Sequence, residues 1–201
     1  MLENRAVTQV AIADLIARRW SSRAIDPDQP VSREQLLALL EAACWAPSCF
    51  GDQPWRYLVW DRFRDPAGWQ QAFECLAEGN QVWVKNAPIL LLAVAAPNFS
   101  HNDQPNRWAQ YDTGAASENL CLQATALGLV AHQMGGFDPE AAKIRFNIPA
   151  NHAGMAMIAV GHPGPVDLLP GVLAEKEPAP RSRRPLVQWA FEGCWGQSVQ
   201  G

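Results

Sequence analysis

The chain has 201 residues, of which 48% are hydrophobic and 18% charged, a composition typical of one globular domain and unlike that of a disordered chain. Its formal net charge of −4 argues against general nucleic-acid binding. The longest apolar run, residues 87–97, is too short to span a bilayer, so no membrane association is expected.

The cysteine spacing and the N-terminal sequence predict the cellular compartment of the protein. The cysteines show neither CxxC spacing nor a paired histidine, which argues against a disulfide framework and against a zinc site. The chain does not open with a basic region followed by an apolar run, so no signal peptide is predicted. We therefore expect a reduced, cytoplasmic protein.

Two helices are predicted near the start. Apolar residues recur at roughly helical intervals over residues 8–19. Residues 32–45 predict a clearer helix, because Ser32 and Gln35 form a capping-box pattern ahead of a broad apolar face. Pro47 ends this helix.

The middle of the chain alternates between strands and helices. Residues 55–61 (WRYLVWD) read as a strand, residues 66–84 as a helix, and residues 87–96 as a strand buried on both faces. The polar, turn-rich segment at residues 97–106 predicts a loop.

A long helix from about Thr113 to Leu127 comes next, with Gly128 as its left-handed cap. Two further strands lie within residues 128–136 and 154–162, separated by a short helix that starts near Asp138. Because no strict βαβ alternation is visible, the sequence favours an α+β fold in one domain, residues 1–201.

The tail, residues 163–201, contains six prolines. We expect it to extend over a surface, that of another subunit.

The segment RRWSSR, residues 18–23, could bind an anion. If it is extended, Arg19, Ser21 and Arg23 lie on one face, where two guanidiniums and a hydroxyl can hold one phosphate. The alternative is that these arginines only complement the dipole at a helix C-terminus.

The segment RSRRP, residues 181–185, repeats this alternation with Arg181 and Arg183 after a proline-rich approach. Its alternative is a solvated basic turn. The two arginine groups can serve one phosphate only if the tail folds back to the N-terminal helix.

The segment QMGGFD follows an apolar strand, and Gly135 and Gly136 would let backbone N–H groups approach a planar ligand. The alternative is an ordinary turn into a helix capped by Asp138. His132, within the apolar strand, is expected to be a core residue. Ser48 and Cys49 have no nearby base and are not predicted nucleophiles.

Together these segments resemble the nitroreductase family of FMN-dependent oxidoreductases. RRWSSRAID is similar to its Arg-x-Ser-x-Arg phosphate motif, and EAACWAPSCFGDQPWRY to its helix end followed by Ala-Pro-Ser-x-x-Asn-x-Gln-Pro-Trp. EGNQVWVKNAPILLLAVA, the Gly-Leu turn with GGFD after it, and RSRRPLVQWAFEG follow in the expected order, so the resemblance covers about residues 12–196.

The resemblance implies a nitroreductase-like α+β fold, with a mixed or antiparallel sheet flanked by helices, and an intertwined homodimer with FMN at the subunit interface. Residues of the two arginine segments would hold the phosphate and ribityl chain. A loop of the partner would line the flavin ring, and the glycines and an asparagine would contact its polar edge. The implied FMN-binding residues are Arg19, Trp20, Ser21, Arg23, Pro47, Ser48, Cys49, Gly51, Asn80, Gly135, Gly136, Arg181 and Arg183.

Two positions depart from the family pattern. Gly51 stands where the family usually has asparagine, so a side-chain contact is lost or Asp52 replaces it. Trp20 stands where a second basic residue or histidine is frequent.

The implied activity is hydride transfer from NADH or NADPH through flavin N5 to a small organic acceptor, of the nitroaromatic, quinone or enone type, by a ping-pong mechanism. No side chain is assigned as a general acid. Candidate walls of the acceptor site are Phe50, Trp69 and the loop at residues 97–111, and the alternative for each is packing in the core or on the surface. The alternatives are a flavin-binding or storage protein without turnover, a same-fold dehydrogenase or dehalogenase, and a scaffold dimer.

Overall fold

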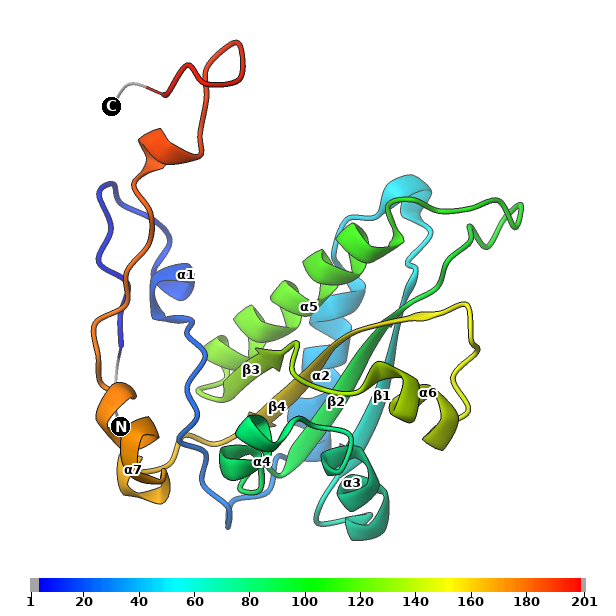
Figure 1. Ribbon diagram of the computed structural model, residues 1–201, viewed down its shortest axis with the longest axis vertical. Helices are drawn as coiled ribbons and strands as arrows, with labels where there is room; N and C mark the ends of the chain where they lie inside the picture. Colours follow the sequence, from blue (N-terminus) through cyan, green and yellow to red (C-terminus); the bar gives the residue numbers. More distant parts are fainter. Residues whose placement is uncertain (1–3, 200–201) are drawn as a thin grey trace.

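A computed structural model describes residues 4–199 and shows an α+β fold, as the sequence predicts (Figure 1). The strands are β1 (Trp55–Asp61), β2 (Ile89–Ala95), β3 (Val130–Met134) and β4 (Ala153–Gly161). The helices are α1 (Asp14–Arg18), α2 (Arg33–Cys44), α3 (Pro66–Phe73), α4 (Glu78–Val84), α5 (Ala109–Ala126), α6 (Pro139–Arg145) and α7 (Gly171–Lys176). Short 3-10 turns cover Cys49–Gly51, Val166–Leu168 and Leu186–Gln188.

The four strands of the described sheet lie in the order β1-β2-β4-β3, and every neighbouring pair is antiparallel. All of β2 is buried, because strands flank it on both edges and helices cover both faces. Leu90 and Leu92 belong to one core cluster, and Ile89 and Leu91 to the other. This confirms the prediction of a strand buried on both faces.

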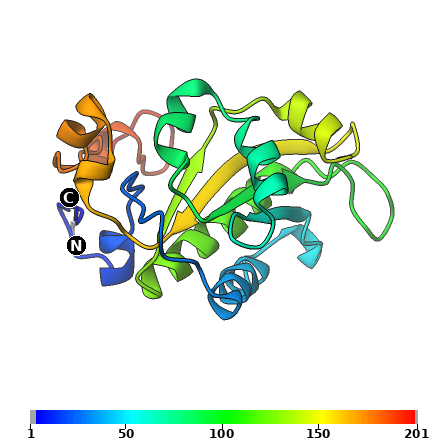
Figure 2. The ribbon, with the colours of Figure 1, turned by 90° about the horizontal axis from the view of Figure 1, so that it is seen from below.

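The helices form a layer on each face of the sheet. Helices α2 and α5 cover one face, while α3, α4 and α6 cover the other (Figures 1 and 2). The capping box predicted for α2 is present, since Ser32 Oγ accepts from the Gln35 N–H and the Gln35 side chain accepts from the Ser32 N–H. Asp138 caps α6, also as predicted.

Three predicted helix boundaries were wrong. The first helix covers only α1, because Val10 and Ile12 are exposed and their spacing meets no core. The predicted helix at residues 66–84 is divided, since Leu76 is buried in the core between α3 and α4 and forms a bridge with Phe137. Helix α5 begins at Ala109, earlier than predicted.

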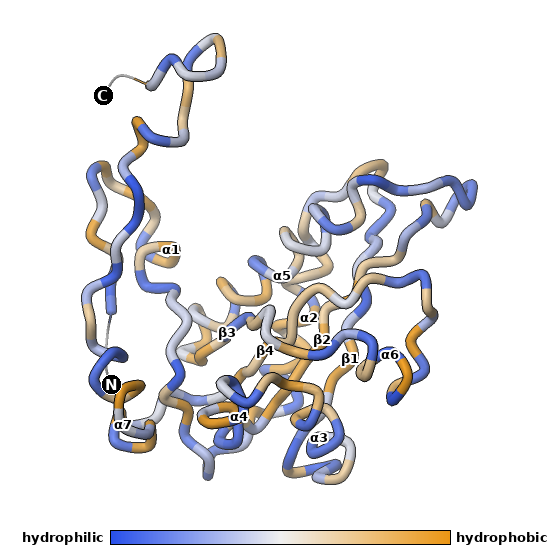
Figure 3. The backbone as a smooth tube through the Cα atoms, viewed as in Figure 1, coloured by the Kyte–Doolittle hydropathy of each residue, from blue (hydrophilic) through white to orange (hydrophobic). Residues whose placement is uncertain are grey.

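After β4 the tail runs beside the N-terminal segment, and both project away from the sheet (Figures 1 and 2). Asn4 Nδ2 donates to the Ala179 carbonyl at 2.8 Å. Apolar positions occur along both segments (Figure 3). Their exposed large apolar side chains include Val7, Val10, Ile16, Val187, Trp189 and Trp195. The tail therefore packs on its own chain, and its contact with another subunit stays a prediction.

Candidate functional site

The segment that follows α1 is extended and anchored to the end of the sheet. Arg19 caps α1 with ψ of 123°, so the helix stops before the RWSSR residues. Ile25 forms an antiparallel bridge with Pro163, and the Gly164 N–H donates to the Ala24 carbonyl at 2.9 Å. A Cβ at Gly164 would lie only 2.8 Å from the Asp26 nitrogen, so glycine is needed for this close approach.

Two of the alternating side chains of this segment, Arg19 and Ser21, lie together, as the sequence predicts. Arg19 Nη1 lies 3.4 Å from Ser21 Oγ, and Arg19 Nε lies 3.4 Å from a carboxylate oxygen of Glu118 on α5. Burial is the main cause of the lowered pKa of His132 on β3, and the positive charges of Arg23 and Arg19 lower it further.

The tail brings a third arginine to this place. Arg181 Nη1 donates to the Arg19 carbonyl at 2.7 Å, and its Nη2 donates to the Ala17 carbonyl at 2.6 Å. Burial lowers the pKa of Arg181, and the positive charges of Arg19 and Arg183 lower it further. The two arginine groups therefore converge, and the buried Arg181 Nε has no hydrogen-bond partner within residues 4–199.

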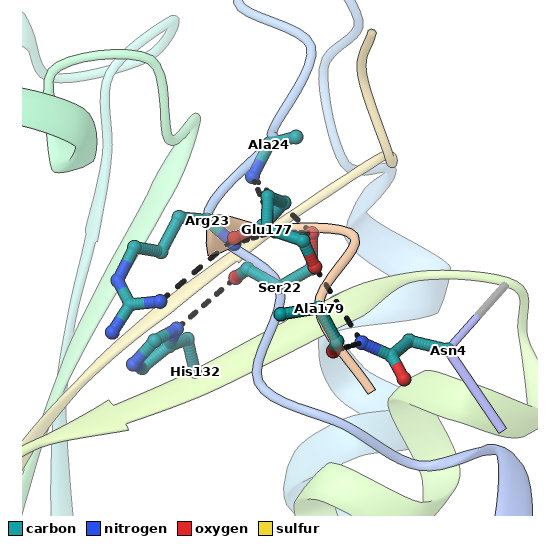
Figure 4. Close-up of polar contacts among 7 residues, drawn as sticks. All are labelled: Asn4, Ser22, Arg23, Ala24, His132, Glu177 and Ala179. Atoms are coloured by element: carbon teal, nitrogen blue, oxygen red, sulfur yellow. Dashed lines mark hydrogen bonds and ion pairs between the residues drawn. The ribbon is translucent and has the colours of Figure 1, made fainter. Parts of the chain in front are cut away.

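Arg23 lies beside a buried acid that the sequence reasoning missed. Its Nη1 is 3.8 Å from Glu177 Oε2, and the Glu177 side chain is 1% exposed (Figure 4). Glu177 follows α7 in the proline-rich tail, where no local pattern distinguishes it from the exposed Glu175. Only the tertiary contact with residues 22–24 identifies it.

His132 is a satisfied core residue, as expected. Its Nδ1 lies 3.1 Å from the Ser22 carbonyl, which can only accept, so Nδ1 carries the proton. Its ring packs on Trp83 with centroids 4.6 Å apart. Burial is the main cause that lowers the pKa of His132 to about 4, and therefore the ring is neutral at pH 7.

Asn80 lies next to the double glycine after β3. Asn80 Nδ2 donates to the Gly136 carbonyl at 2.9 Å. A Cβ at Gly136 would meet Asn80 Nδ2 at 2.7 Å, whereas a Cβ at Gly135 would meet nothing within 4 Å among the described residues. The sequence-predicted ring-edge residues thus form one group, with open space at Gly135.

The loop after α2 lies apart from these groups in the same chain (Figures 1 and 2). The Cys49 N–H donates to Asp112 Oδ2 on α5 at 3.0 Å, and Ser48 Oγ accepts from the Gln53 N–H at 3.1 Å. Pro47 is exposed. Asp112 is buried, and the sequence reasoning missed this support because a lone aspartate in a helix gives no signal.

The structure shows the neighbours of Gly51 and Trp20, the two positions that depart from the family pattern. Gly51 has φ of +65° and no neighbour within 4 Å of a Cβ among the described residues. Asp52 Oδ1 accepts from both the N–H and the hydroxyl of Ser100, so its carboxylate is engaged within the chain. Trp20 is half-buried and lines a cavity of about 100 Å³ beside Leu129.

Of the two aromatic residues considered as walls of the acceptor site, Phe50 lies on the surface and Trp69 in the core. Phe50 is 84% exposed and makes edge contacts with Phe99 and His101, with centroids 5.7 and 5.9 Å apart. Trp69 is buried and stacks on Phe73 within the core, so the candidate wall at Trp69 was wrong.

Residues 4–199 contain neither a candidate metal site nor a candidate membrane span. No cluster of histidine, cysteine, aspartate and glutamate in this part of the chain could hold a metal ion. None of its helices has the length and apolar character to cross a membrane.

Comparison with known proteins identifies the family. Residues 16–162 match the nitroreductase family. A crystal structure of an oxidoreductase containing FMN is 37% identical, with TM-score 0.90 over 97% of this chain and 98% of that one. A protein described as a nitroreductase, from Desulfovibrio desulfuricans and in complex with FMN, is 28% identical, with TM-score 0.69 over 94% and 99% of the two chains. The NADH dehydrogenase of Thermus thermophilus is 30% identical over 67% of this chain and 78% of its own. The chain belongs to the nitroreductase family of oxidoreductases.

Proposed function

We propose that this protein is an FMN-dependent oxidoreductase that takes reducing equivalents from NADH or NADPH and passes them to a small organic acceptor. The observation that carries the proposal is the convergence of Arg181 with Arg19 and Ser21, from opposite ends of the chain. FMN in the structures with 37% and 28% identity, and NADH in the name of the Thermus relative, support it.

The residues present are suited to the phosphate of FMN. Burial is the main cause of the lowered pKa of Arg181, and the nearby positive charges of Arg19 and Arg183 lower it further. A phosphate dianion would remove that repulsion and accept charge-assisted hydrogen bonds, of which each contributes about 1.5–3 kcal/mol. Ser21 adds a hydroxyl to the same face.

The glycine group is suited to the flavin ring. The open space at Gly135 would let a planar ring approach the main chain, and Asn80, bonded to the Gly136 carbonyl, keeps that turn in place. When bound, FMN would supply hydride transfer from the nicotinamide to the acceptor, which no protein side chain can supply. The role of this chain is to bind, orient and polarise, and neutral His132 adds no charge beside the site.

The complete site requires a second copy of the chain. Pro47, Ser48 and Cys49 would line the ring from the partner, because in one chain their loop lies apart from the arginines (Figure 1). The exposed apolar residues of both projecting segments, Trp189 and Val10 among them, support burial in a homodimer. Exposed Phe50 would then provide an aromatic wall for a nitroaromatic, quinone or enone acceptor.

Anaerobic mixing tests the activity directly. Addition of NADH or NADPH to the flavin-loaded protein should bleach the flavin absorption band, and a quinone or nitroaromatic should restore it. Initial rates against both substrates should give parallel lines, as expected of a ping-pong mechanism at one site. Bound flavin that neither nucleotide bleaches would contradict turnover and would indicate a flavin-binding protein instead.

A further inference from the structure

Glu177 is a buried carboxylate that holds the segment carrying Arg23 (Figure 4). Its Oε1 accepts from Ser22 Oγ at 2.6 Å, from the Arg23 N–H at 2.7 Å and from the Ala24 N–H at 3.3 Å. Arg23 and Glu177 lie 154 positions apart in the sequence. One oxygen atom of the tail therefore fixes the main chain on both sides of Arg23.

The opposite side of this segment is also held. His132 Nδ1 donates to the Ser22 carbonyl at 3.1 Å, so Ser22 is bonded to β3 and to the tail at once. The Arg23 side chain remains 38% exposed while its main chain is fixed. A fixed main chain with a partly exposed guanidinium is suited to binding a ligand.

Stability alone does not explain a buried carboxylate here. A buried charge has a large desolvation cost, and apolar residues of similar size often stabilise a protein equally well. Glu177 Oε2 has no hydrogen-bond partner within the described chain, and its nearest cation is Arg23 at 3.8 Å. What Glu177 contributes is therefore a defined main-chain geometry.

We propose that Glu177 is a positioning residue for the phosphate site: its Oε1 fixes residues 22–24 so that the Arg23 guanidinium joins Arg19 and Arg181 around the phosphate. The same stretch of tail carries Arg181, which bonds to the Arg19 carbonyl. The tail thus sets the spacing of all three guanidiniums. This inference rests on the proposed function, since the ligand is the phosphate of FMN.

Two substitutions of Glu177 distinguish the effect of its hydrogen bonds to the main chain from the effect of its negative charge. Glu177→Gln keeps an oxygen that can accept from the Arg23 and Ala24 N–H groups but removes the negative charge. Glu177→Ala removes both. Glu175→Gln is the matched control, because Glu175 lies on α7 and is exposed.

The experiment measures the dissociation constants of FMN and of riboflavin, which lacks the phosphate, by flavin fluorescence quenching with each apoprotein. Glu177→Ala should weaken FMN by about tenfold or more, equivalent to loss of one charge-assisted contact, and change riboflavin by less than about twofold. Glu177→Gln should stay within about threefold of the wild type for FMN, since the hydrogen-bonded main chain is retained. Glu175→Gln should match the wild type.

Three results would overturn the inference. Glu177→Ala could weaken FMN and riboflavin equally, which would indicate a general loss of structure. It could leave FMN binding unchanged. Glu177→Gln could lose as much FMN affinity as Glu177→Ala, which would assign the effect to charge and not to main-chain geometry.

A measurement without flavin separates this inference from the proposed function. In the apoprotein, hydrogen exchange of the peptide that contains the Arg23 and Ala24 amides should accelerate in Glu177→Ala and not in Glu177→Gln. Unchanged exchange in Glu177→Ala would overturn the positioning role whatever the flavin result. A wild-type protein that binds neither flavin would instead overturn the proposed function.

Discussion

Arg181 donates a 2.7 Å hydrogen bond to the carbonyl oxygen of Arg19, a residue 162 positions earlier in the chain. This bond closes the tail onto the N-terminal segment and brings the second arginine group to the first. The Arg183 side chain follows two residues later and is exposed, and its Nη1 donates to the neighbouring Ser182 carbonyl. The site therefore depends on contacts between the two ends of the sequence.

Arg183→Ala should weaken FMN by about tenfold or more, because one charge-assisted bond to the phosphate is lost. Its thermal midpoint should change little, since the side chain is exposed. Arg184→Ala is the control, because Arg184 is also exposed but alternates to the other side of the extended segment. Titration with FMN and riboflavin checks this, and equal effects of the two substitutions on FMN would contradict the assignment.

Gly135→Ala and Gly136→Ala should have different effects. A Cβ at Gly135 meets nothing within 4 Å in the described chain, so the apoprotein should keep its stability while the binding of FMN and riboflavin falls together. A Cβ at Gly136 would displace Asn80, so that variant should also lose thermal stability. Thermal melts and flavin titrations measure both. Unchanged flavin affinity in Gly135→Ala would show that the ring lies elsewhere.

Asp112→Ala should weaken the binding of FMN and of riboflavin by a similar factor. The substitution leaves the Cys49 N–H unpaired and releases a loop that is predicted to contact the flavin ring and not the phosphate. An unpaired donor costs about 1–3 kcal/mol when it is buried. Asp112→Asn should retain most of the affinity, since its amide oxygen can accept the same bond. A loss confined to FMN would be inconsistent with a ring-lining loop.

Mixed dimers show whether the site is shared between subunits. Co-expression of Asp112→Ala chains with Arg183→Ala chains should give heterodimers in which one site has both parts intact and the other has neither. Half of the heterodimer sites should then bind FMN with wild-type affinity. If each site belongs to a single chain, no site in the heterodimer regains that affinity.

His132 should make the apoprotein less stable in acid. Its pKa is about 4 in the folded chain against an ordinary value of 6.5, so between these values the unfolded chain binds a proton that the folded chain does not. The free energy of unfolding should therefore fall as the pH drops below about 6.5, by about 2–3 kcal/mol at pH 4.5 from this residue. Urea unfolding at pH 7.5 and 4.5, compared with His132→Asn, isolates the effect. An equal loss in the variant would exclude His132 as the cause.

Local patterns predicted the parts of the fold that local physics determines. Ser32 with Gln35, and Asp138 before a proline, satisfy the free N–H groups of a helix start, and both caps are present. The apolar run of β2 predicted a strand buried on both faces, and every residue of β2 is buried. The first helix was predicted too long because the spacing of Val10 and Ile12 is helical although both are exposed.

The candidate site was only partly predictable. Alternation correctly placed Arg19 beside Ser21, since an extended chain has a period of two, and the same face for Arg23 stays a prediction. Glu177 and Asp112 gave no signal, because each acts on a main-chain N–H distant in the sequence. Such contacts follow from the tertiary fold and not from a local pattern.

The most direct test of the account is the absorption spectrum of the purified protein, followed by identification of the small molecule released on denaturation. We predict a flavin band and release of FMN, with one FMN for each chain of a homodimer. A colourless protein that does not bind added FMN would contradict the central claim that arginines from both ends of the chain hold its phosphate.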